Sequence, residues 1–137
     1  MMPRLVYIAG PYASAPASNT DAAKDLARVA WVLGKAPVVP HVSIMAGVWG
    51  HDYIDEERQR GRECSLALLR AVRDTGGELW VIKTDDNGYS QGTQRELDEW
   101  MRVGDWSDVT QGTWAEWQTR AHVAGIRLAD RGFGVPR

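Results

Sequence analysis

The order of short apolar runs and helical patterns constrains the fold of this chain most strongly. Three runs, RLVYIA, APVVP and ELWVI, occupy positions 4–9, 36–40 and 78–82, and each is bounded by glycine or proline on at least one side. Continuous apolar runs of this length are typical of strands that are buried on both faces. Because segments with helical spacing lie between them, the sequence predicts βαβ units. These would form a small parallel sheet flanked by helices, a Rossmann-like three-layer α/β sandwich.

The helical segments continue past the last predicted strand. Helices are predicted at about 19–33, 51–74, 93–103 and 114–128. The last of these carries Trp114 and Trp117, for which core packing or a contact between identical chains is the favoured interpretation. We therefore divide the chain into an α/β domain, residues 1–104, and a C-terminal helical extension, residues 105–137. The extension is expected to pack on the same domain or on a neighbouring subunit.

Composition excludes several classes of partner. The 137 residues suit one domain, and a net charge of −2 gives no basic face for polymeric nucleic acid. No apolar stretch approaches the roughly 18 residues of a membrane span, so no membrane partner is expected. The N-terminus has no signal-peptide pattern, and the single cysteine, Cys64, fits a reducing compartment. We therefore expect a cytoplasmic protein.

Several common site motifs are missing from the sequence. His41, His51 and His122 are far apart, and neither C-x-x-C nor H-E-x-x-H occurs, so we expect no metal site. No G-x-G-x-x-G follows the first predicted strand, and the chain contains no G-x-x-x-x-G-K-[ST]. This argues against dinucleotide-dependent redox enzymes and P-loop NTPases, and we expect no cofactor.

Polar segments follow the predicted strands. Gly10-Pro11-Tyr12 follows the first strand, His41 follows the second, and the loop 83–96 follows the third. Each has a plain structural interpretation as a turn or a loop. However, ligands of parallel α/β sheets bind outside the carboxyl ends of the strands, so we expect these segments to share one pocket.

The stretch NGYSQGTQREL, residues 87–97, has two interpretations. Thr93 and Glu96 form an S/T-x-x-E capping box, in which Glu96 would only cap a helix. Alternatively, Ser90 and Gly92 lie at a helix N-terminus that could bind a phosphate, with Glu96 facing the attached sugar. Residues 93–96 taken alone favour the capping box. However, a capping box does not explain Ser90 and Gly92.

The acids before this stretch also have two interpretations. Asp85 and Asp86 are turn-forming residues ahead of Asn87-Gly88, or one of them is a second carboxylate beside Glu96. Cys64 shares a predicted helix face with apolar residues, and we interpret it as a core residue rather than a nucleophile.

These segments resemble, in order and spacing, the nucleoside 2-deoxyribosyltransferase-like superfamily, which includes nucleotide N-hydrolases. The resemblance covers roughly residues 4–103. The matching pieces are YIAGPY at 7–12, Asn19-x-x-x-Ala23, VVPH at 38–41, LWVI at 79–82 and Ser90-x-Gly92-x-x-x-Glu96.

The resemblance implies that Glu96 is a nucleophile that attacks the anomeric carbon of a nucleoside or nucleoside 5′-monophosphate and displaces the base. Tyr12 would orient this carboxylate, Asp85 would act as a second catalytic carboxylate, and water or a second base would be the acceptor. The resemblance also implies a homodimer or higher homo-oligomer whose sites a neighbouring subunit completes. The residues expected to contact the substrate are Gly10, Pro11, Asn19, His41, Asp86, Ser90 and Gly92.

Some features depart from this family pattern. The family has an aspartate just before its third strand, where this chain has Gly76-Gly77-Glu78, and Asp74 or Asp85 is the candidate substitute. The helix that carries the glutamate is commonly followed by another strand in the family, whereas here a tryptophan-rich segment follows. Gly92-Thr93-x-x-Glu96 is also similar to phosphoribohydrolases that release cytokinin-type bases. A non-catalytic nucleotide sensor of the same fold is a further alternative.

Overall fold

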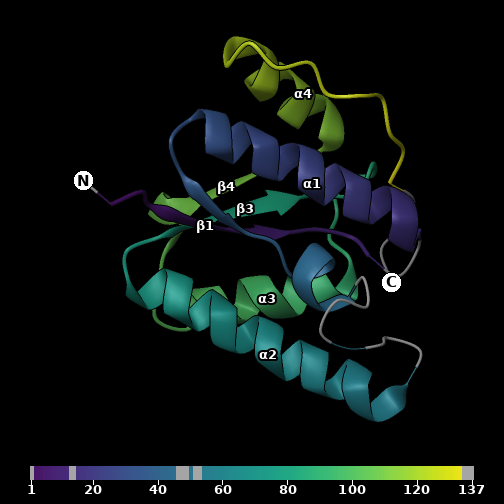
Figure 1. The fold of residues 1–137 in the computed structure, drawn as a ribbon, viewed down its shortest axis with the longest axis vertical. Helices are drawn as coiled ribbons and strands as arrows, with labels where there is room; N and C mark the ends of the chain where they lie inside the picture. Colours follow the sequence, from purple (N-terminus) through teal and green to yellow (C-terminus); the bar gives the residue numbers. More distant parts are fainter. Residues whose placement is uncertain (1, 13–14, 46–49, 51–53, 134–137) are drawn as a thin grey trace.

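The computed structural model describes residues 2–12, 15–45, 50 and 54–133. Four strands form one parallel sheet with helices on both faces, as Figure 1 shows, which confirms the predicted α/β sandwich. The elements are β1 (Leu5–Ala9), α1 (Pro16–Val32), β2 (Ala36–Val38), a π-helical turn (His41–Met45), α2 (Asp55–Asp74), β3 (Glu78–Ile82), α3 (Gln91–Met101), a 3₁₀ turn (Trp106–Asp108), β4 (Val109–Gly112) and α4 (Trp114–Val123).

The strand order β2-β1-β3-β4 determines where a ligand can bind. β1 pairs with β2 on one side, Leu5 opposite Ala36, and with β3 on the other, Val6 opposite Glu78. The chain therefore places β2 on one side of β1 and then returns to place β3 on the other side. In open parallel sheets the ligand site lies at such a reversal, outside the carboxyl ends of the two central strands. Here these are the ends of β1 and β3.

Side chains of the central strands alternate between two cores. α1 and α4 cover one face of the sheet, and α2 and α3 cover the other (Figure 1). Val6 and Ile8 of β1 enter the core under α1 and α4. Tyr7 and Ala9 enter the core under α2 and α3, because successive side chains of a strand point to opposite faces. Tyr7 therefore faces the helix that carries Glu96.

The C-terminal segment contains a strand that the sequence analysis missed. Val109–Gly112 pairs in parallel with β3, Leu79 opposite Val109, so the segment is not purely helical. The sequence VTQG has no apolar run because β4 lies at the edge of the sheet and is mostly half-buried. A strand therefore follows α3, where the sequence analysis expected a helical extension.

The last helix is shorter than predicted. α4 ends at Val123 rather than near residue 128, and Gly125 follows with a φ of 79°, a left-handed conformation that favours glycine. Trp114 and Trp117 of α4 are buried in the core with α1, whereas Trp106 is 50% exposed. The residues after 105 therefore extend the common sheet with β4 and share the core under α1.

The other helix boundaries differ from prediction by a few residues. α1 begins at Pro16, because proline is well suited to the first turn of a helix, and α3 begins at Gln91. The predicted start of α2 at residues 51 and 52 lies outside the described residues. Within the described part of the chain, no helix is both long and apolar enough to cross a membrane.

Candidate functional site

Glu96 is held by a tyrosine from the central strand. The Tyr7 hydroxyl, on β1, donates a hydrogen bond to Oε2 of Glu96, on α3. Tyr7 is fully buried and Glu96 is partly buried. The side chain of Ser65, on α2, lies close enough to Tyr7 to lower the pKa of its hydroxyl. The carboxyl group therefore lies where β1, α2 and α3 meet.

The pKa values of this pair are shifted by their surroundings. Burial raises the pKa of Glu96 to about 7, and the Tyr7 hydrogen bond and the charge of Arg95 oppose that rise. Burial and the charge of Glu96 raise the pKa of Tyr7 well above its usual value, so the phenol keeps its proton and donates. A carboxyl group with a pKa near neutral pH is suited to proton transfer or nucleophilic attack.

The structure contradicts the capping-box interpretation of Glu96. The N-cap of α3 is Ser90, whose Oγ accepts a hydrogen bond from the Thr93 amide at 3.2 Å. The Ser90 hydroxyl in turn donates to Oγ1 of Thr93 at 2.8 Å. Glu96 lies in the second turn of the helix, too far along to cap it. The cap and the carboxyl group thus have separate tasks.

The first turn of α3 combines a small residue with a cation. A side chain at Gly92 would have the Arg95 guanidinium as its nearest neighbour, 3.7 Å from the Cβ position. Arg95 therefore lies over the first turn, next to backbone amides that the helix itself leaves unpaired. A guanidinium beside a helix N-terminus favours an anion there.

The carboxyl end of β1 is packed closely against β3. A Cβ atom at Gly10 would lie 3.0 Å from the Ile82 side chain, so glycine permits this approach. Nε2 of His41 donates to the carbonyl oxygens of Gly10 and Pro11, at 3.1 and 3.0 Å. His41 is buried, and burial lowers its pKa, so the ring is neutral at pH 7. It braces the turn that follows β1.

Tyr12 and Asn19 lie beside His41 and the turn that it stabilises. Nδ2 of Asn19 donates to the carbonyl oxygen of Tyr12 at 3.2 Å, and Asn19 is buried. The Tyr12 ring packs edge-on against His41 with centroids 5.5 Å apart. The structure therefore brings Gly10, Pro11, Tyr12, Asn19 and His41 together at the end of β1.

Tyr7 is the site residue that sequence reasoning missed. It lies inside the apolar run of β1, where it was interpreted only as part of a buried strand, and the orienting role was given to Tyr12. A signal was available, because a buried tyrosine hydroxyl usually finds a hydrogen-bond partner. Position 7 also alternates with Val6 and Ile8, which places it on the other face of the sheet.

Asp86 forms the turn that one interpretation predicted. Its Oδ1 accepts hydrogen bonds from the Thr84 hydroxyl and from the Gly88 amide, the latter at 3.1 Å. The Thr84 and Gly88 bonds lower the pKa of Asp86. It is therefore ionised at neutral pH and not suited to donate a proton to a leaving base.

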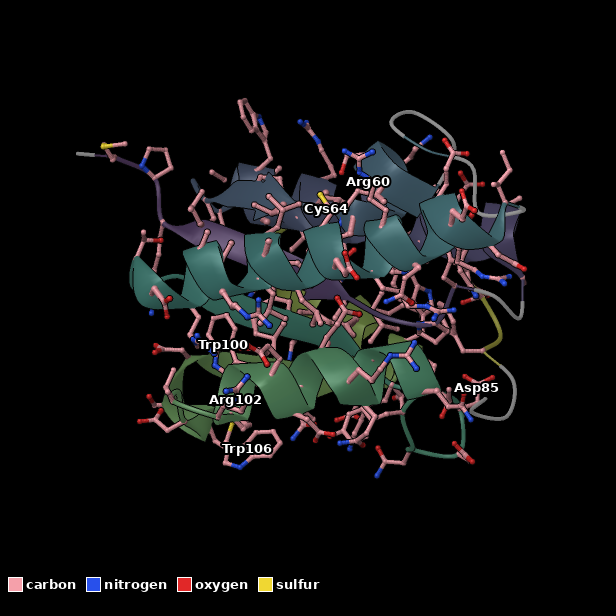
Figure 2. The ribbon with its side chains drawn as sticks, turned by 90° about the horizontal axis from the view of Figure 1, so that it is seen from below. Arg60, Cys64, Asp85, Trp100, Arg102 and Trp106 are labelled. Atoms are coloured by element: carbon pink, nitrogen blue, oxygen red, sulfur yellow. The ribbon has the colours of Figure 1, made fainter. Side chains whose placement is uncertain are left out.

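Asp85 is bound by the C-terminal segment. Its Oδ2 accepts a hydrogen bond from the Phe133 amide at 2.8 Å. Figure 2 shows Asp85 at the opposite end of the molecule from Trp100 and Trp106. The predicted second carboxylate thus has a structural partner of its own.

Asp74 lies before the amino end of β3, away from the strand end that leads to α3. It ends α2 and forms an ion pair with Arg73 at 2.8 Å, just before β3 begins at Glu78. The candidate site is at the other end of β3, roughly 16 Å away for a strand of this length. The same separation applies to Glu78, which pairs with Lys35. Among the described residues, no group of three or more metal-binding side chains gathers.

The fold and these contacts define a Rossmann-like α/β protein with a candidate ligand site at the carboxyl ends of β1 and β3. The chain belongs to the family described as a domain of unknown function, DUF7768, whose model matches residues 4–105. It is also similar to ribose 1,5-bisphosphate phosphokinase PhnN from Desulfomicrobium baculatum, at 32% identity over 106 residues. That match covers 75% of this chain and 49% of the relative, so the chain spans about half the length of the curated relative. No solved structure matches the chain significantly.

Proposed function

We propose that this chain cleaves the N-glycosidic bond of a nucleoside or nucleoside 5′-monophosphate, with Glu96 as the nucleophile. The observation that carries the proposal is the Tyr7–Glu96 pair. A carboxyl group with a pKa of about 7 is held by one neutral donor, on the helix whose first turn follows the loop after β3. A carboxyl group with only a structural role would be expected to pair with a cation instead.

The chemistry follows from the position of this carboxylate. Ionised Glu96 attacks the anomeric carbon, an ester bond forms to the sugar, and the bond to the base breaks. The base leaves with the bonding electrons and takes up a proton. Water or a second base then attacks the same carbon and releases Glu96, as in retaining glycosidases. The Tyr7 hydroxyl orients one carboxylate oxygen and leaves the other for attack.

The first turn of α3 suits the phosphate of a nucleotide. Its first amides and the Arg95 guanidinium offer donors and positive charge on the helix that also carries Glu96. The curated relative is, by its name, a kinase of ribose 1,5-bisphosphate, which is also a phosphorylated sugar. Both observations favour a ribosyl or deoxyribosyl phosphate as the ligand.

Other functions have less support. Phosphoryl transfer, which the relative's name suggests, lacks a P-loop sequence in this chain, and the match covers half of the relative. A phosphoribohydrolase of the cytokinin-activating type would break the same class of bond. A non-catalytic nucleotide sensor would keep the phosphate site but would not need Glu96. We also expect a homo-oligomer, which sedimentation at micromolar concentration would reveal.

The test is a panel of ribo- and deoxyribonucleosides and their 5′-monophosphates, with the released base measured by chromatography. We expect release from at least one substrate and its loss in Glu96→Gln. Glu63→Gln, on the exposed face of α2, is the matched control and should keep full activity. Base release that persists in Glu96→Gln would exclude this mechanism. Binding of nucleotides without release, with or without an added free base, would favour the sensor.

A further inference from the structure

The C-terminal strap, residues 125–133, crosses the molecule from α4 to the candidate site. It follows α4 and runs along the side of α1 to the end of the molecule where the carboxyl ends of the strands lie (Figure 1). The strap has no regular secondary structure, but α4 anchors its middle. Nε1 of Trp114 donates to the Ala129 carbonyl at 2.6 Å, and Gln118 donates to Asp130 at 2.8 Å.

The far end of the strap is buried more deeply than its start. Arg131 forms an ion pair with Asp25 of α1 at 2.9 Å. Phe133 is 2% exposed, and its ring lies 5.7 Å from that of Trp114. These contacts fix the backbone of Phe133 in one place, where its polar groups can act as fixed partners.

Those backbone groups bind Asp85 twice. The Phe133 amide donates to Oδ2 of Asp85 at 2.8 Å, and the Asp85 amide donates to the Phe133 carbonyl at 2.8 Å. One residue of the β3–α3 loop is thus held through both its backbone and its side chain. Asp85 is itself exposed, so this pairing is not a consequence of deep burial.

Asp85 lies at the start of the loop that leads to the phosphate-binding turn. The loop folds tightly, with the Thr84 amide donating to the Gly88 carbonyl at 2.9 Å and Asn87 at a φ of 67°. It ends at Ser90, the N-cap of α3. Movement of Asp85 would therefore be passed to Ser90 through a short and rigid connection.

We propose that Asp85 is a positioning residue, and that the C-terminal strap completes the candidate site by fixing the loop 84–90 through it. The inference rests on the proposed function, because that function gives the loop its ligand. The strap lies beyond residue 105, where the family match ends. This positioning role replaces the expected catalytic role of Asp85.

The matched variants Asp85→Asn and Asp85→Ala test the inference. Asparagine keeps an oxygen that accepts from the Phe133 amide but loses the charge, whereas alanine loses both. Loss of one such hydrogen bond corresponds to roughly a fivefold change in an equilibrium constant. We expect Asp85→Ala to raise the KM for the best nucleotide by about that factor, with a smaller change in kcat. Amide hydrogen exchange in residues 84–90 should also become faster. Asp85→Asn should resemble the wild type in both.

A control separates the loop from the strap as a whole. Asp130→Ala removes the bond to Gln118 but leaves the Phe133–Asp85 pairing, so it should change neither KM nor exchange in the loop. If Asp85→Asn is as damaging as Asp85→Ala, the charge is what matters and the inference is wrong. It is equally wrong if Asp85→Ala speeds exchange and leaves KM unchanged. If the wild type neither binds nor cleaves any nucleotide, the proposed function fails and this inference falls with it.

Discussion

Two glutamates on one helix show how surroundings assign roles at the level of single residues. Glu99 of α3 accepts hydrogen bonds from Arg70 at 2.5 Å and from Arg102 at 3.1 Å, and these interactions lower its pKa. Glu96, three positions earlier, has a phenol as its partner and a pKa raised by burial. Opposite pKa shifts in neighbouring acids are a sign of different tasks. Glu99 links α2 to α3 through its ion pairs, whereas Glu96 has no cation partner among these contacts and is the proposed nucleophile.

The raised pKa of Glu96 predicts how stability changes with pH. The folded-state value of about 7 lies above the ordinary 4.5, so between these values the folded protein binds more protons than the unfolded chain. The free energy of unfolding therefore falls as pH rises from 5 to 8, by about 3 kcal/mol from this residue. Denaturant unfolding should be measured for the wild type and for Glu96→Gln at both pH values. The difference between their free energies of unfolding should change by that amount. A difference that is independent of pH would contradict the shift.

Tyr7→Phe tests the donor in this pair. Since the Tyr7 hydrogen bond is the largest of the interactions that lower the Glu96 pKa, its loss should raise that pKa further. The rising limb of the pH–rate profile should move to higher pH by roughly one unit, and base release at pH 7 should fall about fivefold. Tyr89→Phe is the control, because the Tyr89 hydroxyl donates to Gln111 instead. An unmoved limb in Tyr7→Phe would show that Tyr7 does not act on the carboxylate.

At the scale of elements, the apolar runs predicted β1, β3 and the edge strand β2, but they missed β4 at the other edge. The predicted and observed bounds of β3 are the same, and those of β1 differ by one residue, because both strands are buried on both faces. β4 has no such signal, since an edge strand needs few apolar side chains. The start of α3 was placed at the wrong hydroxyl: Ser90 and Thr93 both fit a capping pattern. Two contacts in the three-dimensional structure separate these alternatives: the Ser90–Thr93 cap and the hydrogen bond from Tyr7 to Glu96.

Ser90→Ala should weaken the start of α3. The variant removes the oxygen that accepts from the Thr93 amide, and such a cap contributes about 1 kcal/mol. Ser90→Thr keeps the acceptor and should retain most of the stability. Urea unfolding of both variants measures the difference. If Ser90→Ala were as stable as the wild type, the N-cap would have to be assigned to another residue.

At the scale of the molecule, the C-terminal segment after residue 105 belongs to the same folded unit as the matched family domain. The predicted division at residue 104 falls between α3 and β4, yet β4 extends the common sheet. Nε1 of Trp117 donates to the Val81 carbonyl in β3 at 2.9 Å, and its ring stacks at 5.1 Å on Trp80. These contacts connect α4 directly to the strand whose carboxyl end forms the candidate site.

Trp117→Phe should therefore destabilise the whole protein rather than residues 105–137 alone. The variant loses a buried hydrogen bond and ring volume, so we expect a loss of roughly 2 kcal/mol in the free energy of unfolding. Trp106→Phe, at a half-exposed position, should change it by less than about 0.5 kcal/mol. Circular dichroism and tryptophan fluorescence should report one coincident transition in each case. Two separate transitions, with only one shifted by Trp117→Phe, would mean that residues 105–137 unfold independently. The strap could then not hold the site from a stable core.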